Sequence, residues 1–597
     1  MNHRLGNTAC AAVAIAVLLV VGMAIAVPAM AAVERQAGAG KPTPGSGMGT
    51  QAALTNPRCT VNERTAPYGR FTSTIVGGGP LCVKPWSDGD DNGGKTSRGI
   101  TADRITIVAV VPNDQQIDIQ AQQGGTPPVN RTDMSRGKYE DAVHDYLLAY
   151  MKYYETWGRD IEIKFVKSTG SDEQTQRADS VTVKAEKPFA VLDLTPVGLD
   201  VLEAEMAKAK ILVYGYATTT KKALAQAPYR WGQTDAQSSA INAGEVLGKQ
   251  LVGKKAEHAG DENLQGQTRK FGAVYIQDVI DIDQFKSYLE KYGGTLTTEN
   301  SYRSNGSTIG DATLAQEQAP IIVTKMKNSG VTTVVLFTDV EMTKALLLQA
   351  TKQEWNPEWF LTGAVYQDLA ILARPYDQQQ FAHAFGISNL SPWVVPAPAP
   401  PPPEKTLGTL TNTLNWYWGE GVATSSLTVP SFLIWVLSGV HTAGPNLTPK
   451  TFRQGLFAVP ATGGAASGYP VGFMTGYGKN PGLPYDEYLQ LGLDFAPVWW
   501  DPDTTGPSQA IGSEGQGVTW YVDGAKRYKS GTWPKTPFKW FDKTGSVVKF
   551  DTSPTPTATY AGPCEGCPSQ GGTGQYGAPN TNGFVAKAAG GGEASLS

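Results

Sequence analysis

The stretch RGITADRITIVAVVPND, residues 98–114, decides the fold that the sequence predicts. Residues 105–111 are β-branched or small with almost no polar alternation, which is typical of a strand covered on both faces, as in a parallel α/β sheet. Pro112 ends this strand. Open α/β sheets bind ligands beyond the carboxyl ends of their strands, so Asn113 and Asp114 are candidate ligand-binding residues.

Length and composition set the class of protein. With 597 residues, 41% of them hydrophobic and 17% charged, the chain is a folded globular protein too long for one ordinary core. We therefore expect two large lobes. The net charge of −4 shows no basic excess, so no nucleic-acid partner is expected.

The first residues resemble a secretory signal. Arg4 precedes an apolar run over residues 9–27 and the small residues Ala29-Met30-Ala31, which predicts cleavage near Ala31. The run is longer than a usual signal core, so an uncleaved membrane anchor is the alternative. We expect an exported protein, in the periplasm, in the cell envelope or secreted.

Four cysteines follow the signal, and their order predicts two local disulfides, Cys59–Cys82 and Cys564–Cys567. Cys564-Glu-Gly-Cys567 also has the spacing of a redox motif, which works at a helix N-terminus. The surrounding sequence AGPCEGCPSQGG cannot start a helix, and this favours a structural disulfide.

Strand and helix patterns alternate through the middle of the chain. This alternation predicts parallel sheets with right-handed crossovers. We expect strands at 105–111, 161–166, 190–194, 211–216, 272–277, 295–302, 333–337, 359–362, 384–388, 494–500 and 518–522, and helices at 139–157, 173–185, 199–208, 240–251, 282–292, 315–327, 342–353, 409–418, 429–441 and 451–456.

The composition of the chain ends, and two successive sets of alternating strand and helix patterns between them, divide the chain into seven parts. Residues 33–57 and 552–597 are rich in Gly, Pro, Ala, Ser and Thr and read as flexible segments. The predicted division is a signal peptide (1–31), a Cys-tied N-terminal segment (32–98), lobe 1 (99–235), lobe 2 (236–390), a return to lobe 1 with a Pro-rich insert (391–470), a hinge and the end of lobe 2 (471–550), and a Gly/Pro-rich tail (551–597).

Catalytic and cofactor motifs are absent from the sequence. It has no phosphate-binding loop, no dinucleotide fingerprint and no zinc-protease motif. Its five histidines, His3, His144, His258, His383 and His441, are scattered, and histidine is the commonest general base. We predict a protein that is not an enzyme and has no cofactor or metal; a hinged binder that closes on a small solute fits better.

Several motifs in order resemble the type I periplasmic solute-binding proteins of the branched-chain amino acid/amide ABC-transporter family. They are GITAD at 99–103 before strand 105–111, KAKILV at 208–213, KNSGVTTVVL at 327–336, TVPSFL at 428–433 and DFAPVWWD at 494–501. The resemblance covers residues 99–528. It implies two Rossmann-like lobes with parallel sheets, three hinge crossings and delivery of the ligand to a membrane permease.

The resemblance places candidate ligand-binding residues at the strand ends: Asn113, Asp114, Thr195, Thr218, Thr219, Asp278, Asp339 and Tyr366. Amino-acid-binding members hold the ligand carboxylate with a donor-rich Ser/Thr turn, whereas the turn here is Thr195-Pro196-Val197-Gly198 and Pro196 has no N–H. An α-amino acid is therefore not the expected ligand. The alternative role for Thr195, Thr218, Asp278 and Asp339 is helix capping.

Three functions are compatible with these residues. The leading one is an extracytoplasmic monomer that captures a small polar solute and delivers it to an ABC import permease. The alternatives are a solute-sensing or scaffolding module not coupled to transport, and a secreted hydrolase, which turnover would distinguish. No Arg or Lys stands at the turns that carry these candidate residues until Lys221 and Lys222, so we predict a neutral or cationic solute, contacted by Asp339 and Thr218.

The signal sequence gives the first testable prediction. We expect the mature protein to begin near Ala32, because the small residues 29–31 suit signal peptidase. The intact mass of protein purified from its native host measures this directly. A mass that retains residues 9–27 would show a membrane-anchored protein instead.

Overall fold

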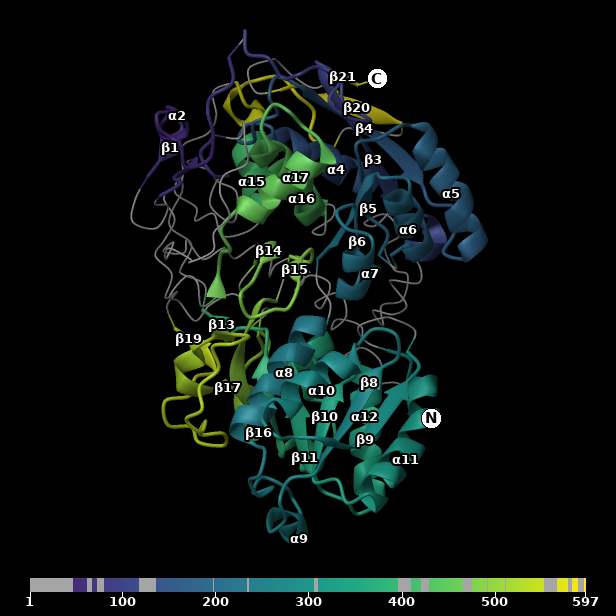
Figure 1. Cartoon of the computed structure of the whole chain (residues 1–597), viewed down its shortest axis with the longest axis vertical. Coiled ribbons are helices and arrows are strands. Elements are labelled where there is room, and N and C mark those ends of the chain that lie inside the picture. The colour runs from purple at the N-terminus through teal and green to yellow at the C-terminus, as the bar shows by residue number, and fades with distance from the viewer. Residues whose placement is uncertain are drawn as a thin grey trace, which may run out of the picture.

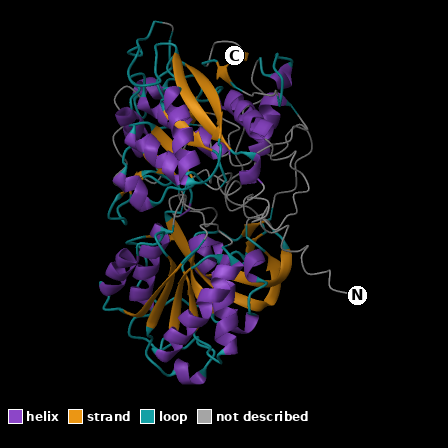
Figure 2. Ribbon diagram, turned by 90° about the vertical axis from the view of Figure 1, so that its right-hand side faces the viewer, coloured by secondary structure: helices purple, strands orange, loops and turns teal. Residues whose placement is uncertain are grey.

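The chain folds into two α/β lobes that lie end to end (Figures 1 and 2). The computed structural model describes residues 47–61, 67–71, 80–87, 89–117, 136–196, 198–233, 236–304, 310–395, 410–419, 429–464, 475–490, 492–509, 512–551, 566–577, 582–588 and 595–596. Lobe 1, the upper lobe in Figure 1, contains the described residues of 47–233, 410–458 and 566–596; lobe 2 contains those of 236–395 and 494–551. Among the described residues, we find no helix whose length and hydropathy would let it span a bilayer.

The lobe 1 sheet is built around β3 (Arg104–Val111). β3 pairs in parallel with β4 (Asp160–Lys167) on one side and with β5 (Ala190–Asp193) on the other. The parallel strands β6 (Leu212–Gly215) and β7 (Arg230–Gly232) continue the sheet beyond β5. The last five residues of β3 are all buried, as the lack of alternation predicts.

Lobe 2 repeats this arrangement around β8 (Phe271–Ile276). β8 lies between the parallel strands β9 (Leu296–Tyr302) and β10 (Thr333–Phe337). The sheet continues through β11 (Glu358–Leu361) and β12 (Ala384–Ser388) to the antiparallel strands β16 (Asp494–Pro507) and β17 (Glu514–Tyr521). Both lobes thus have the doubly wound order 2-1-3-4-5, which confirms the predicted fold class of two Rossmann-like lobes with parallel sheets.

Helices cover the faces of both sheets (Figure 2). Side-chain caps fix several of their starts: Asp172 accepts from Gln174 N–H and Thr175 N–H, and Thr448 forms a capping box with Thr451. Lobe 1 contains α4 (Arg136–Tyr150), α5 (Glu173–Ala185), α6 (Asp200–Lys208), α7 (Thr220–Ala225), α15 (Leu410–Trp418), α16 (Val429–Ala443) and α17 (Pro449–Ala458); lobe 2 contains α8 (Gln237–Gln250), α9 (Glu262–Gln265), α10 (Ile282–Glu290), α11 (Ala312–Asn328), α12 (Val340–Lys352), α13 (Ala370–Ala373) and α14 (Gln378–Phe381).

One predicted helix end is wrong. The aromatic periodicity extends the first helix to Trp157, but α4 ends at Tyr150. The buried Glu155 carboxylate accepts the N–H groups of Thr156 (3.1 Å) and Trp157 (3.0 Å), and Trp157 has a φ of 61°. A side chain that bonds the backbone locally competes with the helix, so the aromatic stripe continues through a turn.

The chain passes between the lobes four times, whereas the resemblance implies three crossings. The crossings follow β7, β12, α17 and β19 (Lys549–Phe550), and they pair with one another. Gly232 of the first accepts from Gln490 N–H of the third at 3.2 Å, and β13 (Trp393–Val394) of the second pairs with β19 of the fourth.

The extra crossing returns the C-terminal segment to lobe 1. β20 (Gly583–Ala586) pairs antiparallel with the free edge of β4, and the Phe584 ring lies 5.0 Å from the His144 ring. The prediction of a flexible tail is therefore wrong for these residues, because pairing with a sheet edge satisfies their backbone groups. The Pro-rich insert, residues 396–403, lies outside the described residues.

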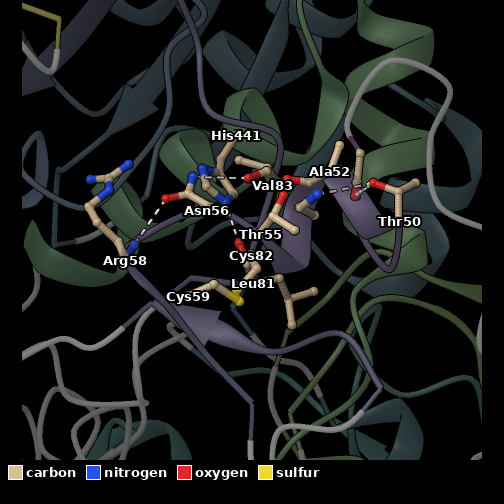
Figure 3. The surroundings of a disulfide bond; sticks show 12 residues. Thr50, Ala52, Thr55, Asn56, Arg58, Cys59, Leu81, Cys82, Val83 and His441 are labelled. Carbon is tan, nitrogen blue, oxygen red and sulfur yellow. Dashed lines mark hydrogen bonds between the residues drawn. A yellow bond between two sulfur atoms is a disulfide. The ribbon is translucent and has the colours of Figure 1, made fainter.

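The N-terminal segment also packs on lobe 1. Met48 and Ala53 are buried in the lobe 1 core, so the flexible segment predicted for 33–57 is wrong from residue 47 onward. The disulfide Cys59–Cys82 confirms one predicted pair (Figure 3). Cys567 is also disulfide-bonded, but Cys564 lies outside the described residues, and the second pairing stays a prediction.

His441 on α16 fastens this segment to lobe 1. Its Nε2 donates to the Leu81 carbonyl at 2.7 Å (Figure 3), and its Nδ1 accepts from Glu155 N–H at 2.8 Å. In the neutral tautomer with the proton on Nε2, both ring nitrogens of His441 therefore have a hydrogen-bond partner. Burial, together with this environment, lowers the pKa of His441 to about 4.

We predict that His441 makes the protein less stable in mild acid. Its unfolded pKa lies above its folded pKa, so its contribution is complete above about pH 6.5 and is lost as the pH falls toward 4, by at most about 1.4 kcal/mol per pH unit. Denaturant unfolding of wild type and His441→Gln between pH 4 and 7 measures this slope. Equal slopes in the two proteins would contradict the assignment.

Candidate functional site

The carboxyl ends of the two sheets point toward each other. α9 precedes β8 and lies at the far end of lobe 2, so the lobe 2 strands run toward lobe 1; α7 follows β6 and lies on the side of lobe 1 that faces lobe 2 (Figure 1). In this strand order, the second strand of each sheet lies on one side of the first, and all later parallel strands lie on its other side. The side on which the chain adds strands therefore reverses between β3 and β5 and between β8 and β10, and open sheets bind ligands at such points. We call this region the inter-lobe site.

Asn113 and Asp114 follow β3 at the reversal point of lobe 1. The Asn113 side chain accepts from Gln116 N–H at 2.8 Å and so caps the next helical turn. The Asp114 carboxylate is 76% exposed, with Lys167 Nζ at 3.3 Å. Asp114 is therefore available to a ligand, whereas Asn113 shapes the turn.

Thr195 follows β5, and a buried carboxylate holds it in place. Asp193 Oδ1 accepts from Thr195 N–H (3.1 Å) and from its hydroxyl (2.6 Å), and Asp193 Oδ2 accepts from Leu199 N–H at 2.7 Å. Burial and the nearby Glu203 charge raise the pKa of Asp193 to about 7. The Thr195 hydroxyl therefore stabilises the loop after β5, and its proton is not available to a ligand.

Thr218 and Thr219 follow β6 beside a buried ion-pair network. The Thr218 hydroxyl donates to Glu203 Oε2 at 2.6 Å, and Arg230 Nη2 donates to the same oxygen at 2.7 Å and to Asp200 at 2.6 Å. Thr219 caps α7 through Lys222 N–H. The side chains of both threonines therefore hydrogen-bond to other residues of lobe 1.

Asp339 follows β10 at the reversal point of lobe 2. Its buried carboxylate caps α12 through Met342 N–H (2.9 Å) and accepts from the Tyr302 hydroxyl (2.9 Å) and the Ser304 hydroxyl (2.8 Å). Burial raises the pKa of Asp339. Three donors in the protein already occupy this carboxylate.

Asp278 and Tyr366 remain free for a ligand on the lobe 2 side. Asp278 is exposed after β8 and has a φ of 61°. Tyr366 is half-buried after β11, in a turn where Val365 has a φ of 54° and Tyr366 one of 59°. Such conformations are strained for a β-branched or bulky residue and concentrate at binding sites.

Asp193, Glu203 and Arg230 are residues that the sequence reasoning missed. Asp193 ends a strand, and Glu203 lies four residues into α6, so neither follows a strand as the candidate residues do. The signal that could have found them is charge inside apolar runs, since a buried carboxylate needs donors nearby. Among the described residues, no group of His, Cys, Asp and Glu side chains is arranged to hold a metal ion.

Solved structures similar to this chain are ABC-transporter solute-binding proteins, the family that the sequence resembles. A substrate-binding protein from Aeropyrum pernix is 11% identical and covers 72% of this chain and 97% of its own, with a TM-score of 0.44. A fatty acid ABC transporter substrate-binding protein from Thermomonospora curvata (13% identical; 74% and 96% covered; TM-score 0.41) is also similar. So is an ABC transporter solute-binding protein from Rhodopseudomonas palustris in complex with 3,4-dihydroxybenzoic acid (12%; 69% and 97%; TM-score 0.38). No family model and no curated protein matches the chain. The fold assignment rests on the strand order and pairing given above.

The Glu203–Arg230 pair gives a prediction about the loops of the inter-lobe site. Glu203→Ala should lower the free energy of unfolding by about 3 to 5 kcal/mol, because it leaves the Arg230 side chain, 2% exposed, without its main counter-charge. Asp114→Ala is the matched control and should change it by less than about 0.5 kcal/mol, because that carboxylate is exposed. Urea unfolding compares them; equal losses would show that Arg230 is compensated otherwise.

Proposed function

We propose that this protein is an extracytoplasmic solute-binding protein that captures a small polar solute between its lobes. The observation that carries the proposal is the pair of reversal points, one after β3 and β5 and one after β8 and β10, on facing edges of two separate sheets. A solute held there would be contacted by both lobes at once.

The construction of the two lobes supports closure about a hinge. Each hydrophobic cluster in the described part of the chain belongs to one lobe only. The crossing segments meet in short pairings, such as Gly232 with Tyr488 and Gln490. Two rigid bodies joined by a few extended segments can rotate with little disturbance to either core, as in hinged binding proteins.

The exposed groups at the inter-lobe site favour a neutral or cationic polar solute, although Lys167 partly offsets the charge of Asp114. Asp114 and Asp278 are exposed carboxylates, and Tyr366 offers a half-buried aromatic ring. The sequence reasoning proposed contacts from Asp339 and Thr218, but the bonds described above already use these side chains. We therefore assign the ligand contacts to Asp114, Asp278 and Tyr366 instead.

Transport is the role that we propose for this capture, with delivery of the solute by a monomer to an ABC import permease. A sensing or scaffolding module would use the same lobes. The third candidate, a secreted hydrolase, would use carboxylates at the same site, such as Asp114 and Asp278, and turnover of the solute would distinguish it.

We predict that a screen of polar solutes by thermal unfolding will identify a stabilising ligand. A solute at 100 times its Kd should add roughly 2.7 kcal/mol to the free energy of unfolding. Tyr366→Ala should then weaken binding about tenfold, because stacking on an aromatic ring contributes on the order of 1 kcal/mol.

Tyr292→Ala is the matched control for this variant. Tyr292 is also half-buried, but it follows α10 at the end of lobe 2 away from the inter-lobe site, so its replacement should leave the affinity unchanged. Equal affinities for all three proteins would place the solute elsewhere. Conversion of the solute into a product would favour the hydrolase.

A further inference from the structure

Asp368 is a buried carboxylate whose two oxygens have no aligned hydrogen-bond partner, and the nearby Ser388 hydroxyl offsets only part of the effect of burial on its pKa. It follows the strained segment after β11, and its side chain has no exposed surface. Neither carboxylate oxygen has an aligned partner, in contrast to Asp193, Glu203 and Asp339. A buried charge without partners is unfavourable, so the folded state needs a way to neutralise this group.

The neighbouring cation cannot do so. Arg527 is the cation whose charge acts on Asp368, but all five N–H groups of its guanidinium have other acceptors. They donate to Asp494 Oδ1 (3.1 Å), to the carbonyls of Leu390 (2.6 Å), Asn389 (2.9 Å) and Asp494 (2.9 Å), and to the Ser391 hydroxyl (3.3 Å). These bonds leave no N–H group of Arg527 directed at Asp368.

The other titratable groups that face Asp368 are tyrosines. They come from its own turn (Tyr366), from the segment after α13 (Tyr376) and from β17 (Tyr521). Burial raises the pKa of each, so all three stay neutral at physiological pH. The Tyr376 and Tyr521 hydroxyls have no aligned partner either, and as neutral groups they supply no positive charge to an Asp368 carboxylate.

The backbone of residues 362–368, which we call the β11 turn, is held firmly on both sides of this carboxyl group. The Thr362 hydroxyl donates to the Leu336 carbonyl at 2.5 Å, and Gln367 Nε2 donates to the Thr338 carbonyl at 2.8 Å. Gln509 Nε2 (3.0 Å) and the Thr519 hydroxyl (2.9 Å) donate to the Asp368 carbonyl. The turn is thus tied to β10 and β17, and only the Asp368 side chain lacks such a tie.

We propose that Asp368 holds a proton in the folded protein, and that its ionisation loosens the β11 turn that carries Tyr366 into the inter-lobe site. As a neutral acid, Asp368 fits between the tyrosine hydroxyls and the apolar core of lobe 2. As an anion, it would draw water into that core and disturb the strained backbone. Burial is the main cause that raises the pKa of Asp368 to about 6, which puts the transition within the range of natural environments.

Asp368→Asn tests this, because asparagine imitates the neutral acid in shape and charge. Asp368 has a higher pKa folded than unfolded, so wild-type stability relative to the variant should fall as the pH rises from about 4 to about 6 and stay constant above. The ratio of the two unfolding equilibrium constants should change roughly 100-fold over this interval, since each pKa unit is a factor of ten. The His441 contribution is common to both proteins and cancels.

Asp114→Asn is the control, and its pH profile should parallel that of wild type because Asp114 is exposed. Amide hydrogen exchange in residues 362–369, corrected for intrinsic rates, should accelerate above pH 6.5 in wild type and not in Asp368→Asn. Parallel stability profiles for wild type and Asp368→Asn would overturn the proposal. Stabilisation of wild type alone by sodium, potassium or calcium chloride at pH 8 would also overturn it, in favour of a bound metal cation.

Wild-type protein labelled with ¹³C-aspartate gives a test that needs no variant. Once assigned, the side-chain carbon resonance of Asp368 should titrate near pH 6, and its titration below pH 5 would contradict the proposal. The consequence for ligand capture rests on the proposed function: wild type should bind its solute more weakly above pH 6.5, and Asp368→Asn should not. If binding by wild type does not weaken above pH 6.5 but its stability relative to Asp368→Asn still depends on pH as described, the result would count against the solute-binding role and not against the protonation of Asp368.

Discussion

The parallel pairing of β3 with β4 on one side and β5 on the other is the constraint on which the rest of the structure depends. A parallel sheet must be covered on both faces, so each strand needs a crossover that returns over the sheet. Every strand of the parallel set then ends at the same edge. Because β8 sets the same order in lobe 2, two such edges are available to one ligand.

Buried carboxylates fix the conformation of the loops that follow the strands at these edges. Asp193 fixes the loop after β5, Glu203 the loop after β6, and Asp339 the start of α12. Each accepts backbone N–H groups inside the protein, and these bonds hold the loops in one conformation. The groups that remain for a solute are therefore few, and the arrangement of the loops is set before any solute arrives, which lowers the ordering cost of binding.

Much of the fold could be predicted because the apolar patterns are strong. Strand 333–337 and helix 173–185 match the structure residue for residue, since β-branched runs and a capped helix leave few alternatives. The end of α4 and the strand β20 could not be predicted, because they depend on contacts distant in sequence, such as Glu155 with His441 and β20 with β4. The aspartates of the site show the same limit: spacing placed Asp339 at a strand end, but only the fold brings Tyr302 and Ser304 to it.

Closure of the two lobes about their paired crossings is the central claim. Spin labels on cysteines placed at Val181 of α5 and Ile321 of α11, which are 65% and 73% exposed, would report the distance between the lobes. The helices α5 and α11 lie on the same side of the molecule in Figure 1, and the native Cys59–Cys82 pair is disulfide-bonded and does not take label. Pulsed electron–electron double resonance, with and without a solute that stabilises the protein, should show a shorter and narrower distance distribution in the bound state. An identical distribution with the solute bound would contradict capture by lobe closure.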